Sequence, residues 1–538
     1  MKNLKFITLS AIAALTLTGC GGKSGILFWS NFGSSYSSAL LTLVEAVEEK
    51  TGIAVNHESQ GSYDKLQKNI NASTGTATYP TIATGYPDHF AGYIKNEIME
   101  SMNEYIEAYD TENGGSLLDD YYPEYMVENQ ELLKGYTFGL PFNKSTEVMT
   151  YNLDLFDYIM TLDNTITKLP ETWDDLKNDG PKYLVALHNS GLFGTVSGKD
   201  ESGVDIVENG KVLYGKRGEN GHISEFFIEN EIVATGDKSK GDLLVDFTHV
   251  AEADFNLFMW DATDNLFITI VRQFGASYTS YTDADRAGPQ HGYADFWSGD
   301  HKPKTIEALK MLYHLYADSP EGVKSRVFAI TDSYNSDAFK AGKVLFTVGS
   351  SGGLSYNLPT GGEKLNNFKV SVAPIPYRDA EHKYVISQGA NLGLFSQGDE
   401  KTLSDAFKVI VALTQGEIQG QWAATTGYYP ATKSATNSKV YQALINNPQT
   451  TPTKVLYQDS ARLNQNIYMD ASKNWIKFVD PGFAGSSSIR TEAANIILPI
   501  LNQRPTIEAA ADKEQALLDA IDEAMAPVLK NLSSYIRK

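Results

Sequence analysis

The sequence predicts a globular chain of several domains with an α/β fold built on a parallel sheet, and three observations lead to these predictions. Short apolar runs alternate with amphipathic segments along the first part of the chain, as in folds where helices cover a parallel sheet. The chain has 538 residues, of which 42% are hydrophobic and 21% charged, which is ordinary for globular proteins. At roughly 150 residues per domain, this length predicts two to four domains.

The first expected elements follow one another in regular order. A buried strand over 26–29 precedes a helix whose apolar residues share one face. The next expected elements are a strand over 53–58, a helix over 63–70 and a strand over 81–84. Ligands of such sheets collect beyond the carboxyl ends of the strands. The loops at Trp29, Tyr63 and Asp88 are therefore the first candidates for a binding site.

The middle of the chain is less regular. Residues 198–241 are rich in Gly, Lys, Asp and Glu and contain two hairpin-like turns, which predicts an inserted β-hairpin region. Further expected elements are helices over 305–317 and from 406, strands over 344–347 and 370–375, and an amphipathic helix over 517–529.

Charge and cysteine content exclude several classes of function. The 45 Lys and Arg residues against 66 Asp and Glu residues give a net charge of −21, which nucleic-acid phosphates would repel. A single cysteine excludes disulfide frameworks and thiolate zinc sites within one chain. The 9 histidines lack metal-ligand spacing, and the common catalytic motifs are absent. We expect neither a cofactor nor a metal, and no enzymatic activity.

The first residues have the pattern of a targeting signal. Lys2 and Lys5 precede an apolar stretch that is too short for the ~20 residues of a membrane span. Leu17-Thr18-Gly19-Cys20 follows and resembles a bacterial lipobox. The pattern implies a signal peptide over 1–19, a diacylated Cys20 and a tether to residue 25, which would hold the protein on the outer side of a cell membrane. The alternative is a buried core cysteine.

Several fragments together resemble a known family, the extracellular solute-binding proteins of carbohydrate-type ABC importers. They occur in the family's order, over 141–146 with 151–156, 170–176, 339–344, 348–352, and 421–422 with 426–430. The resemblance implies a type II periplasmic-binding-protein-like fold, with two α/β lobes, a hinge and a ligand cleft between the lobes. It also implies a monomer that closes on a small solute and docks on membrane permease subunits.

The resemblance also implies boundaries for the lobes. The first lobe is expected over 26–142 plus 344–393, and the second over 146–340 plus 398–538. The chain is expected to cross between lobes near 142–148, 338–344 and 393–398.

The closest likeness is to the branch that binds glycerol 3-phosphate and maltose. The branch's ligand contacts carry over to Tyr63, Ser145, Ser350 or Ser351, Gly389, Tyr428 and Arg490. Two departures leave the identity of the ligand open. Pro87 occupies the position of an acidic residue, with Asp88 one position later, and Lys144 replaces a small polar residue.

The chemistry of these residues suits a polyhydroxylated ligand. Side chains that could hydrogen-bond hydroxyl groups are Asp88, Asn143 and Asn391. Aromatic rings that could stack on a sugar are Trp29, Tyr63, Trp260, Trp297 and Tyr428. Glycine at 389 would let backbone N–H groups approach the ligand.

A phosphate ester is the alternative ligand, either sn-glycerol 3-phosphate or a glycerophosphodiester. Arg490 would then form a bidentate fork, with Ser145 and Ser351 beside it. The strongly negative chain does not steer anions inward, so a neutral sugar ranks above the phosphate ester. Arg490 could instead form only a salt bridge, and the tryptophans could be packing residues.

Two other classes of function stay open. A surface glycosidase needs two carboxylates ~5 to 10 Å apart, which a sequence with this many acidic residues can supply. A surface adhesin or structural lipoprotein would need no small-molecule site.

Overall fold

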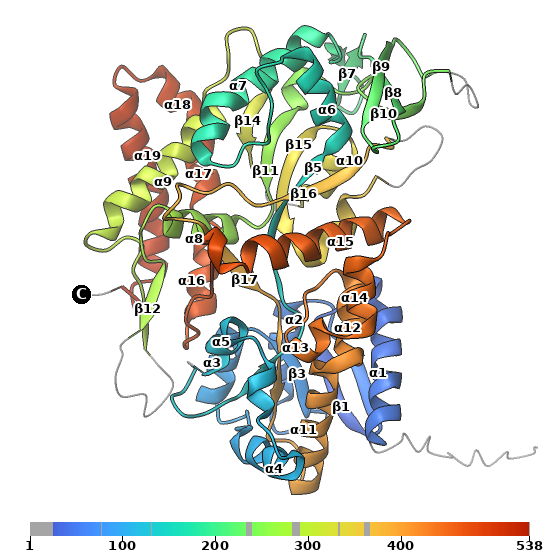
Figure 1. Ribbon diagram of the computed structural model, residues 1–538. Coiled ribbons are helices and arrows are strands. Elements are labelled where there is room, and N and C mark those ends of the chain that lie inside the picture. The colour runs from blue at the N-terminus through green and yellow to red at the C-terminus, as the bar shows by residue number, and fades with distance from the viewer. Residues whose placement is uncertain are drawn as a thin grey trace, which may run out of the picture.

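The computed structural model describes residues 25–76, 78–130, 132–232, 239–281, 291–331, 334–359 and 366–536. The expected signal peptide, Cys20 and nearly all of the tether lie outside the described residues. The described chain forms two lobes stacked end to end, each built on its own main sheet (Figure 1). We call the lobe that contains the first strand the first lobe, and the other the second lobe.

The sheet of the first lobe has five strands. In spatial order they are β2 (Val55–Ser59), β1 (Ile26–Ser30), β3 (Ile82–Gly85), β18 (Asn391–Leu394) and β4 (Gly139–Pro141). β1 is parallel to β2 and β3, whereas β18 is antiparallel to β3 and β4. The predicted alternation of parallel strands and helices over the first 60 or so described residues is therefore confirmed.

Helices cover both faces of this sheet because side chains alternate along its strands. Phe28 of β1 packs with α1, and the next residue, Trp29, points to the opposite face, where Leu66 and Phe90 lie. The covering helices are α1 (Ser37–Thr51), α11 (Glu400–Thr414) and α12 (Gly416–Thr426) on one face, and α2 (Tyr63–Ser73) and α3 (Pro87–Lys95) on the other. The remaining helices of the first lobe are α4 (Asn103–Asn113), α5 (Pro123–Gln130), α13 (Lys433–Thr436) and α14 (Lys439–Asn446).

The sheet of the second lobe is mixed. Its spatial order is β14 (Arg326–Ala329), β11 (Asn256–Trp260), β15 (Val344–Ser350), β5 (Ser145–Asn152), β17 (Tyr384–Gln388) and β19 (Ile476–Phe478), with β16 (Val370–Ala373) also paired to β5. β5 is antiparallel to β15, β16 and β17. This long central strand is buried along nearly its whole length.

One large hydrophobic core joins this sheet to its helices. They are α6 (Leu153–Leu162), α7 (Trp173–Ser190), α8 (Thr263–Gln273), α9 (His301–Ala317), α10 (Ser336–Lys340), α15 (Pro452–Leu463), α16 (Ser486–Ala493), α17 (Ile497–Asn502), α18 (Arg504–Ala509) and α19 (Lys513–Asn531). A capping box of Thr172 and Asp175 begins α7, where the sequence resembles the family's helix entry.

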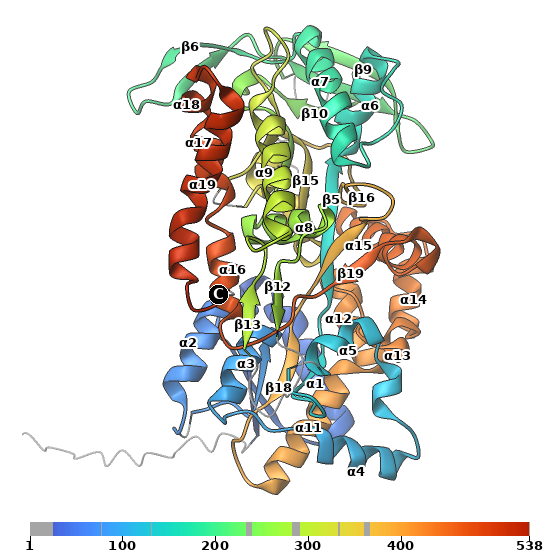
Figure 2. The same ribbon diagram turned by 90° about the vertical axis from the view of Figure 1, so that its left-hand side faces the viewer.

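Smaller β structures project from the second lobe (Figure 2). The expected hairpin region of 198–241 contains β7 (Asp205–Glu208), β8 (Val212–Arg217) and β9 (Ile223–Glu229). β7 pairs with β6 (Thr195–Lys199), which begins before the region, and β8 pairs with β9 and with β10 (Asp242–Asp246), which follows it. A separate hairpin of β12 (Thr279–Tyr281) and β13 (Gly292–Ala294) extends from the end of α8 toward α3 of the first lobe.

The chain passes between the lobes at three places. The first passage joins β4 to β5, where the sequence predicted one. The second joins β17 to β18, a few residues before the expected 393–398, and the third lies between α14 and α15. The passage expected near 338–344 is wrong, because α10 and β15 both belong to the second lobe.

Two of the expected lobe boundaries also differ from the structure. β15 and β16 lie within 344–393 but pair with β5 in the second lobe, because their hydrogen-bond partners are remote in sequence. α11 and α12 lie within 398–538 but pack against α1 in the first lobe.

Candidate ligand-binding site

A cavity of about 620 Å³ lies between the two lobes. The first lobe contributes the N-terminal ends of α2 and α3 together with Glu128 of α5. The second lobe contributes the end of β17, the beginnings of β12 and α8, the segment 479–481 and α16. α16 and the β12–β13 hairpin both reach down to the first lobe here (Figure 2). We call this space the interlobe cavity.

Two tyrosines of the first lobe form one wall of the interlobe cavity. Tyr63 begins α2 directly after Ser62, whose Oγ accepts the Lys65 N–H as an N-cap. Tyr86 precedes Pro87, the first residue of α3, and a residue before proline favours extended backbone. The two rings lie 4.6 Å apart between centroids, at an interplanar angle of 48°. Such tilted aromatic faces can pack on the C–H surface of a sugar.

The segment that joins β17 to β18 contacts Tyr86 of this wall. The Gly389 N–H donates a hydrogen bond to the Tyr86 hydroxyl at 3.4 Å. Gly389 has a φ of +99°, and a Cβ there would lie 1.8 Å from the carbonyl oxygen of Asn143. Only glycine therefore fits at this close approach of the two crossing segments. Burial raises the pKa of the Tyr63 and Tyr86 hydroxyls, so both stay protonated and can donate hydrogen bonds.

Arg490 lies on the opposite wall and already has partners within the second lobe. Its Nε donates to Asp264 Oδ2 at 2.7 Å, and its Nη2 donates to Asn265 Oδ1. Burial lowers the pKa of Arg490, but the carboxylates of Asp264 and Asp88 outweigh this effect and raise it above its usual range. The guanidinium is therefore charged, and Asp264 neutralises most of that charge before any ligand binds.

Glu147 lies behind Arg490 and Asn265, only 1% exposed. Its carboxyl oxygens accept hydrogen bonds from Trp260 Nε1 at 2.9 Å and from Thr269 Oγ1 at 3.4 Å. Burial is the main cause that raises the pKa of Glu147 to about 8. This buried carboxyl therefore holds a proton at neutral pH and helps to fix the base of the Arg490 wall.

Five carboxylates line the interlobe cavity, namely those of Asp64, Asp88, Glu128, Asp264 and Asp480. Three of them pair with a cation, as Glu128 with Lys144 at 2.7 Å, Asp264 with Arg490, and Asp480 with Arg272. Within the described part of the chain, Asp64 and Asp88 have no Lys, Arg or His nitrogen within 4.0 Å. The wall of the cavity is therefore acidic overall.

Several buried polar atoms of this wall lack a hydrogen-bond partner among the described residues. They are Tyr278 Oη, Thr279 Oγ1, Ser387 Oγ, Gln388 Oε1 and Asp480 Oδ2. Leaving such an atom without a partner costs about 1 to 3 kcal/mol. A ligand with several hydroxyl groups can donate to all five and can also accept from the hydroxyls of Tyr278, Thr279 and Ser387, so the chemistry of the wall matches a polyhydroxylated molecule.

The structure brings three of the predicted site residues to the cavity. Tyr63, Asp88 and Arg490 line it, from α2, α3 and α16. Gly389 lies at its edge, next to the lining residue Gln388.

Three other predicted residues lie away from the cavity for reasons of strand geometry and packing. Trp29 is 6% exposed and packs beneath α2 and α3, because strand alternation turns it to that face. Trp260 stacks on Trp173 at 5.8 Å between centroids, in the core of the second lobe. Asn391 is buried, and its Oδ1 accepts a hydrogen bond from Asn129 Nδ2 at 2.9 Å.

The remaining predicted residues form a buried junction beside the cavity. Ser145 pairs with Gln388 in the β5–β17 register, and Ser351 Oγ accepts the Thr146 N–H at 3.4 Å. Ser350 instead caps the turn that follows β15, where its Oγ accepts the Gly352 N–H.

Tyr428 and Asn143 belong to the same junction. The Tyr428 ring lies against Gly352, where an added Cβ would come within 2.6 Å of it, and stacks with Trp422 at 6.4 Å. Asn143 is fully buried where β4 passes into β5. Trp297 was a further candidate for stacking on a sugar. The Lys302 ammonium lies 4.6 Å from the centroid of its ring. None of these side chains lines the interlobe cavity.

Sequence reasoning missed the part of the wall made by Asp264, Tyr278, Thr279 and Asp480. These residues come from the start of α8, from β12 and from the segment after β19, whose positions depend on packing between distant segments. The run of Ser486, Ser487 and Ser488 just before Arg490 was the available signal for α16.

The fold and the cavity define a class, the two-lobed periplasmic-binding-protein-like proteins, in which lobes close around a solute. This chain belongs to the bacterial extracellular solute-binding protein family, whose sequence model matches residues 42–449. None of the curated proteins matches the chain by sequence. No helix among the described residues is long and apolar enough to cross a membrane.

Solved structures share this fold at low sequence identity. UgpB from Mycobacterium tuberculosis in complex with glycerophosphocholine has a TM-score of 0.59 and 15% identity, over 95% of this chain and 99% of that chain. The ABC substrate-binding protein Lmo0181 from Listeria monocytogenes in complex with cycloalternan has a TM-score of 0.57 and 14% identity, over 94% and 98%. Maltose-bound MalE3 from T. maritima has a TM-score of 0.56 and 14% identity, over 93% and 98%.

Proposed function

We propose that this protein is the substrate-binding protein of an ABC importer and captures a carbohydrate in the interlobe cavity. The observation that carries the proposal is the set of buried polar atoms that have no hydrogen-bond partner among the described residues, on a wall that also holds two tilted tyrosines. Hydroxyl groups satisfy the first feature and sugar C–H surfaces the second. The chain binds and releases its ligand without altering it.

The charge of the cavity supports a sugar over a phosphate ester. An incoming phosphate would have to compete with Asp264 for Arg490, and it would approach the carboxylates of Asp64 and Asp88. Repulsion between the phosphate and these carboxylates would weaken binding of the phosphate ester. Two of the structurally similar proteins were solved with cycloalternan and with maltose, which agrees with this choice.

A glycerophosphodiester is the second candidate. Arg490 and the serines at the beginning of α16 offer a guanidinium, hydroxyls and backbone N–H groups on one wall. The similarity of fold to UgpB, solved with glycerophosphocholine, points in the same direction.

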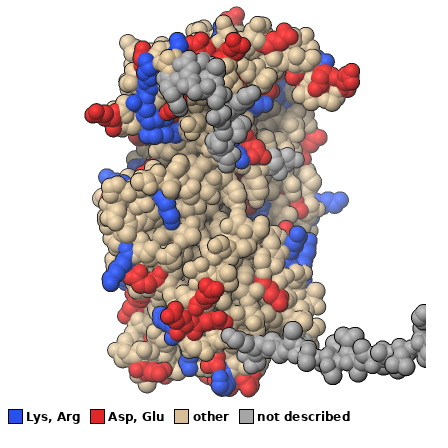
Figure 3. Space-filling model, turned by 90° about the vertical axis from the view of Figure 1, so that its right-hand side faces the viewer, with Lys and Arg blue, Asp and Glu red and all other residues tan. Residues whose placement is uncertain are grey.

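The first residues and the surface of the protein both fit a binding protein that works beside a membrane permease. Acylation of Cys20 would hold the body beside the membrane, where permease subunits receive the ligand. The face that carries α1, α14 and α15 has few charged side chains across the middle, where the two lobes meet (Figure 3). Such a band, shared by both lobes, suits docking on a permease that must recognise the closed form.

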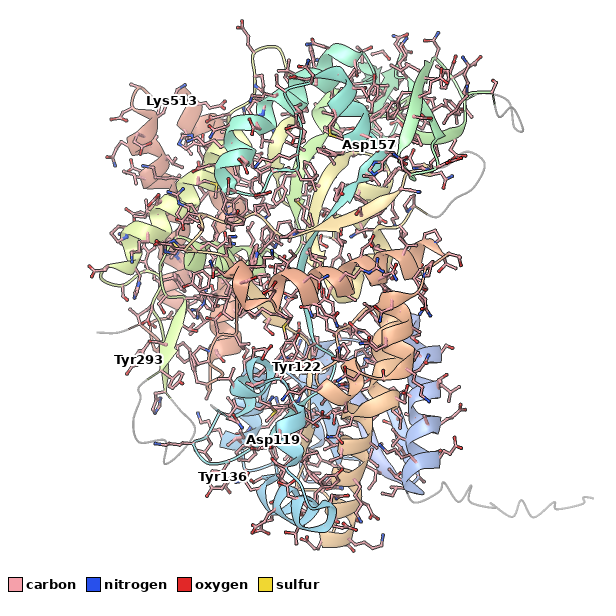
Figure 4. All side chains as sticks on the ribbon, in the orientation of Figure 1. Asp119, Tyr122, Tyr136, Asp157, Tyr293 and Lys513 are labelled. Atoms are coloured by element: carbon pink, nitrogen blue, oxygen red, sulfur yellow. The ribbon has the colours of Figure 1, made fainter. Side chains whose placement is uncertain are left out.

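A thermal-shift screen followed by calorimetric titration tests the ligand class. We expect sugars or oligosaccharides to raise the melting temperature, and glycerol 3-phosphate to raise it less. Tyr63→Ala should weaken binding, whereas Tyr136→Ala, which removes an exposed tyrosine elsewhere on the first lobe (Figure 4), should not. Recovery of the ligand unchanged after incubation supports a binding protein. Hydrolysis of a glycoside, or no stabilisation by any member of the panel, contradicts the proposal.

A further inference from the structure

The acidic wall of the interlobe cavity narrows the ligand class further, an inference that rests on the proposed function. Three cations pair with three of the five lining carboxylates, whereas Asp64 and Asp88 have no cationic nitrogen within 4.0 Å in the described part of the chain. Arg490 interacts with Asp88 only from a longer distance and is itself paired with Asp264, so the wall keeps an excess of negative charge. These carboxylates can accept hydrogen bonds from the hydroxyls of a neutral sugar. Only a cationic ligand would in addition neutralise the excess of negative charge.

Asp480 is one of the paired carboxylates, and Arg272 holds it at the wall of the cavity. Its Oδ1 accepts hydrogen bonds from Nε and Nη2 of Arg272, and the Arg272 guanidinium lies 4.7 Å from the Phe478 ring centroid. Its Oδ2 is buried and has no partner within the described chain. One oxygen thus fixes the carboxylate of Asp480, which lines the cavity, and the other has no hydrogen-bond partner among the described residues.

The segment that carries Asp480 lies directly against the helix that carries Asp88. Gly482, two residues after Asp480, packs so closely on Pro87 that an added Cβ would lie 2.7 Å from the Pro87 carbonyl carbon. Asp88 follows Pro87 at the beginning of α3. The two carboxylates therefore face the same cavity from different lobes, and a group bound between them would contact both lobes.

The hydroxyl of Tyr278 lies among these charges. Tyr278 is 3% exposed and its hydroxyl has no partner among the described residues. Burial raises its pKa, the carboxylates of Asp480, Asp264 and Asp88 raise it further, and Arg490 opposes them. The potential at this buried hydroxyl is therefore set by more negative charges than positive ones.

A metal ion is a poor candidate for this position. No group of three or more His, Cys, Asp or Glu side chains in the described ranges is close enough together to hold one. The carboxylates instead surround a larger space whose wall also carries the aromatic rings of Tyr63 and Tyr86. A bulky organic cation suits such a space, because aromatic faces and carboxylates both attract it.

We propose that the interlobe cavity binds a carbohydrate or polyol bearing a positively charged amino group, whose nitrogen lies between Asp88 of the first lobe and Asp480 of the second. The hydroxyls of the ligand satisfy Thr279, Ser387 and Gln388. Its cation gives Asp88 a positively charged partner and donates a hydrogen bond to the oxygen of Asp480 that Arg272 leaves free. Because this nitrogen contacts both lobes, it favours the closed form over the open one.

Matched pairs of probes test the proposal by calorimetric titration. Glucosamine oligomers are compared with the same oligomers fully N-acetylated, and glycerophosphocholine with glycerophosphoglycerol, a phosphodiester without a cation, so that the members of each pair differ chiefly in the cationic group. We expect the cationic member of a pair to bind about tenfold more tightly or better, and less so at high salt. Calcium chloride alone is a further probe, and we expect no stabilisation by it.

Substitutions of Asp88 and Asp480 test whether these carboxylates cause the preference for a cationic ligand. Asp88→Asn keeps the shape of the side chain at the start of α3, and it should remove most of the preference for the cation. Asp480→Asn should do the same. Since it also weakens the Arg272 pair, the melting temperature of the unliganded variant shows whether it folds. Asp119→Asn removes an exposed carboxylate remote from the cavity (Figure 4) and is the matched control for net charge.

The outcomes separate this inference from the proposed function. Neutral sugars that bind as tightly as cationic ones, or a preference that survives Asp88→Asn, overturn the inference and leave a carbohydrate-binding protein. Stabilisation by calcium alone also overturns it. Binding of none of the saccharides or glycerol derivatives contradicts the proposed function itself.

Discussion

Gly482 of the second lobe packs directly on Pro87 of the first lobe. A Cβ at Gly482 would lie 2.7 Å from the carbonyl carbon of Pro87 and 2.8 Å from its Cβ. Distances below 3.0 Å to backbone atoms leave no room for a side chain. The lobes therefore meet backbone to backbone at the rim of the interlobe cavity, beside Asp88.

Replacing Gly482 by valine should hinder closure without damaging either lobe. Separating the lobes would move Gly482 away from Pro87 and so make room for the added methyl groups, whereas the arrangement in which the two residues touch would carry an overpacking penalty of about 1 to 3 kcal/mol. We expect roughly 5-fold to 150-fold weaker binding of the saccharide that gives the largest thermal shift. Small-angle scattering at saturating ligand should show a larger radius of gyration than for the unchanged protein.

Gly115→Val is the control for this variant, because an added Cβ at Gly115 meets nothing within 4 Å. Its affinity and its compaction on binding should match those of the unchanged protein. Gly482→Val with unchanged affinity and unchanged compaction would show that the contact with Pro87 is no part of the closed form.

The pair of Lys144 and Glu128 ties the first lobe to the passage between lobes. Their N–O distance is 2.7 Å, and the two side chains are 0% and 2% exposed. Lys144 also donates to the carbonyl oxygen of Gly389, in the second passage. We expect Lys144→Met to lower the free energy of unfolding by about 3 to 5 kcal/mol, because it leaves the Glu128 charge buried without a partner. Urea denaturation measures this loss.

Two comparisons separate charge burial from packing at this site. The double variant K144M/E128Q should recover part of the loss, since it removes the unpaired charge. Lys182→Met breaks an exposed pair with Asp179, whose side chains are 49% and 39% exposed, and should cost less than about 1 kcal/mol. A Lys144→Met variant no less stable than Lys182→Met would contradict the buried-pair argument.

Local patterns predicted local structure well. β1, α1, β2, α2 and β3 lie where apolar periodicity placed them, because each element buries the face that its own sequence marks. The lobe assignment of 344–393 failed, since β15 joins its sheet through β5, almost 200 residues earlier in the chain. No periodicity within a segment specifies a partner so far away.

The candidate site was predicted only in part for the same reason. Tyr63, Asp88 and Arg490 follow from the resemblance and from strand ends, and they line the cavity. Tyr278 and Asp480 line it because Phe483 packs onto Gly292 and thereby holds the segment after β19 against the β12–β13 hairpin. That packing depends on residues that are remote in sequence and individually unremarkable.

Lys477 should make the free energy of unfolding rise with pH between about pH 7 and pH 10. Its Nζ donates to the Tyr125 hydroxyl at 2.8 Å and to Asn464 Oδ1 at 2.9 Å, and burial lowers its pKa to about 7. In the unfolded chain a lysine has a pKa of about 10.4, so between pH 7 and pH 10 the unfolded state binds more protons. The contribution of Lys477 to the free energy of unfolding therefore rises with pH across this window.

Lys477→Met should remove that rise. Melting temperatures at pH 7, 8 and 9 should increase less with pH in this variant than in the unchanged protein. Lys324→Met, which changes an exposed lysine, should keep the original slope. Equal slopes in all three proteins would mean that Lys477 titrates normally in the folded state.

Glu147, which lies beneath the Arg490 wall, should make the free energy of unfolding fall as the pH rises, the opposite of the effect of Lys477. Burial raises its pKa from 4.5 to about 8, so between these values the folded state binds more protons than the unfolded state. Its contribution to the free energy of unfolding is complete below about pH 4.5 and is lost as the pH rises to about 8. Glu147→Gln keeps an acceptor for Trp260 Nε1 and cannot ionise, so its stability should fall less between pH 5 and pH 8. Urea denaturation at these pH values measures the slope, with the exposed Glu171→Gln as control. A slope in Glu147→Gln as steep as in the control would place the proton on another group.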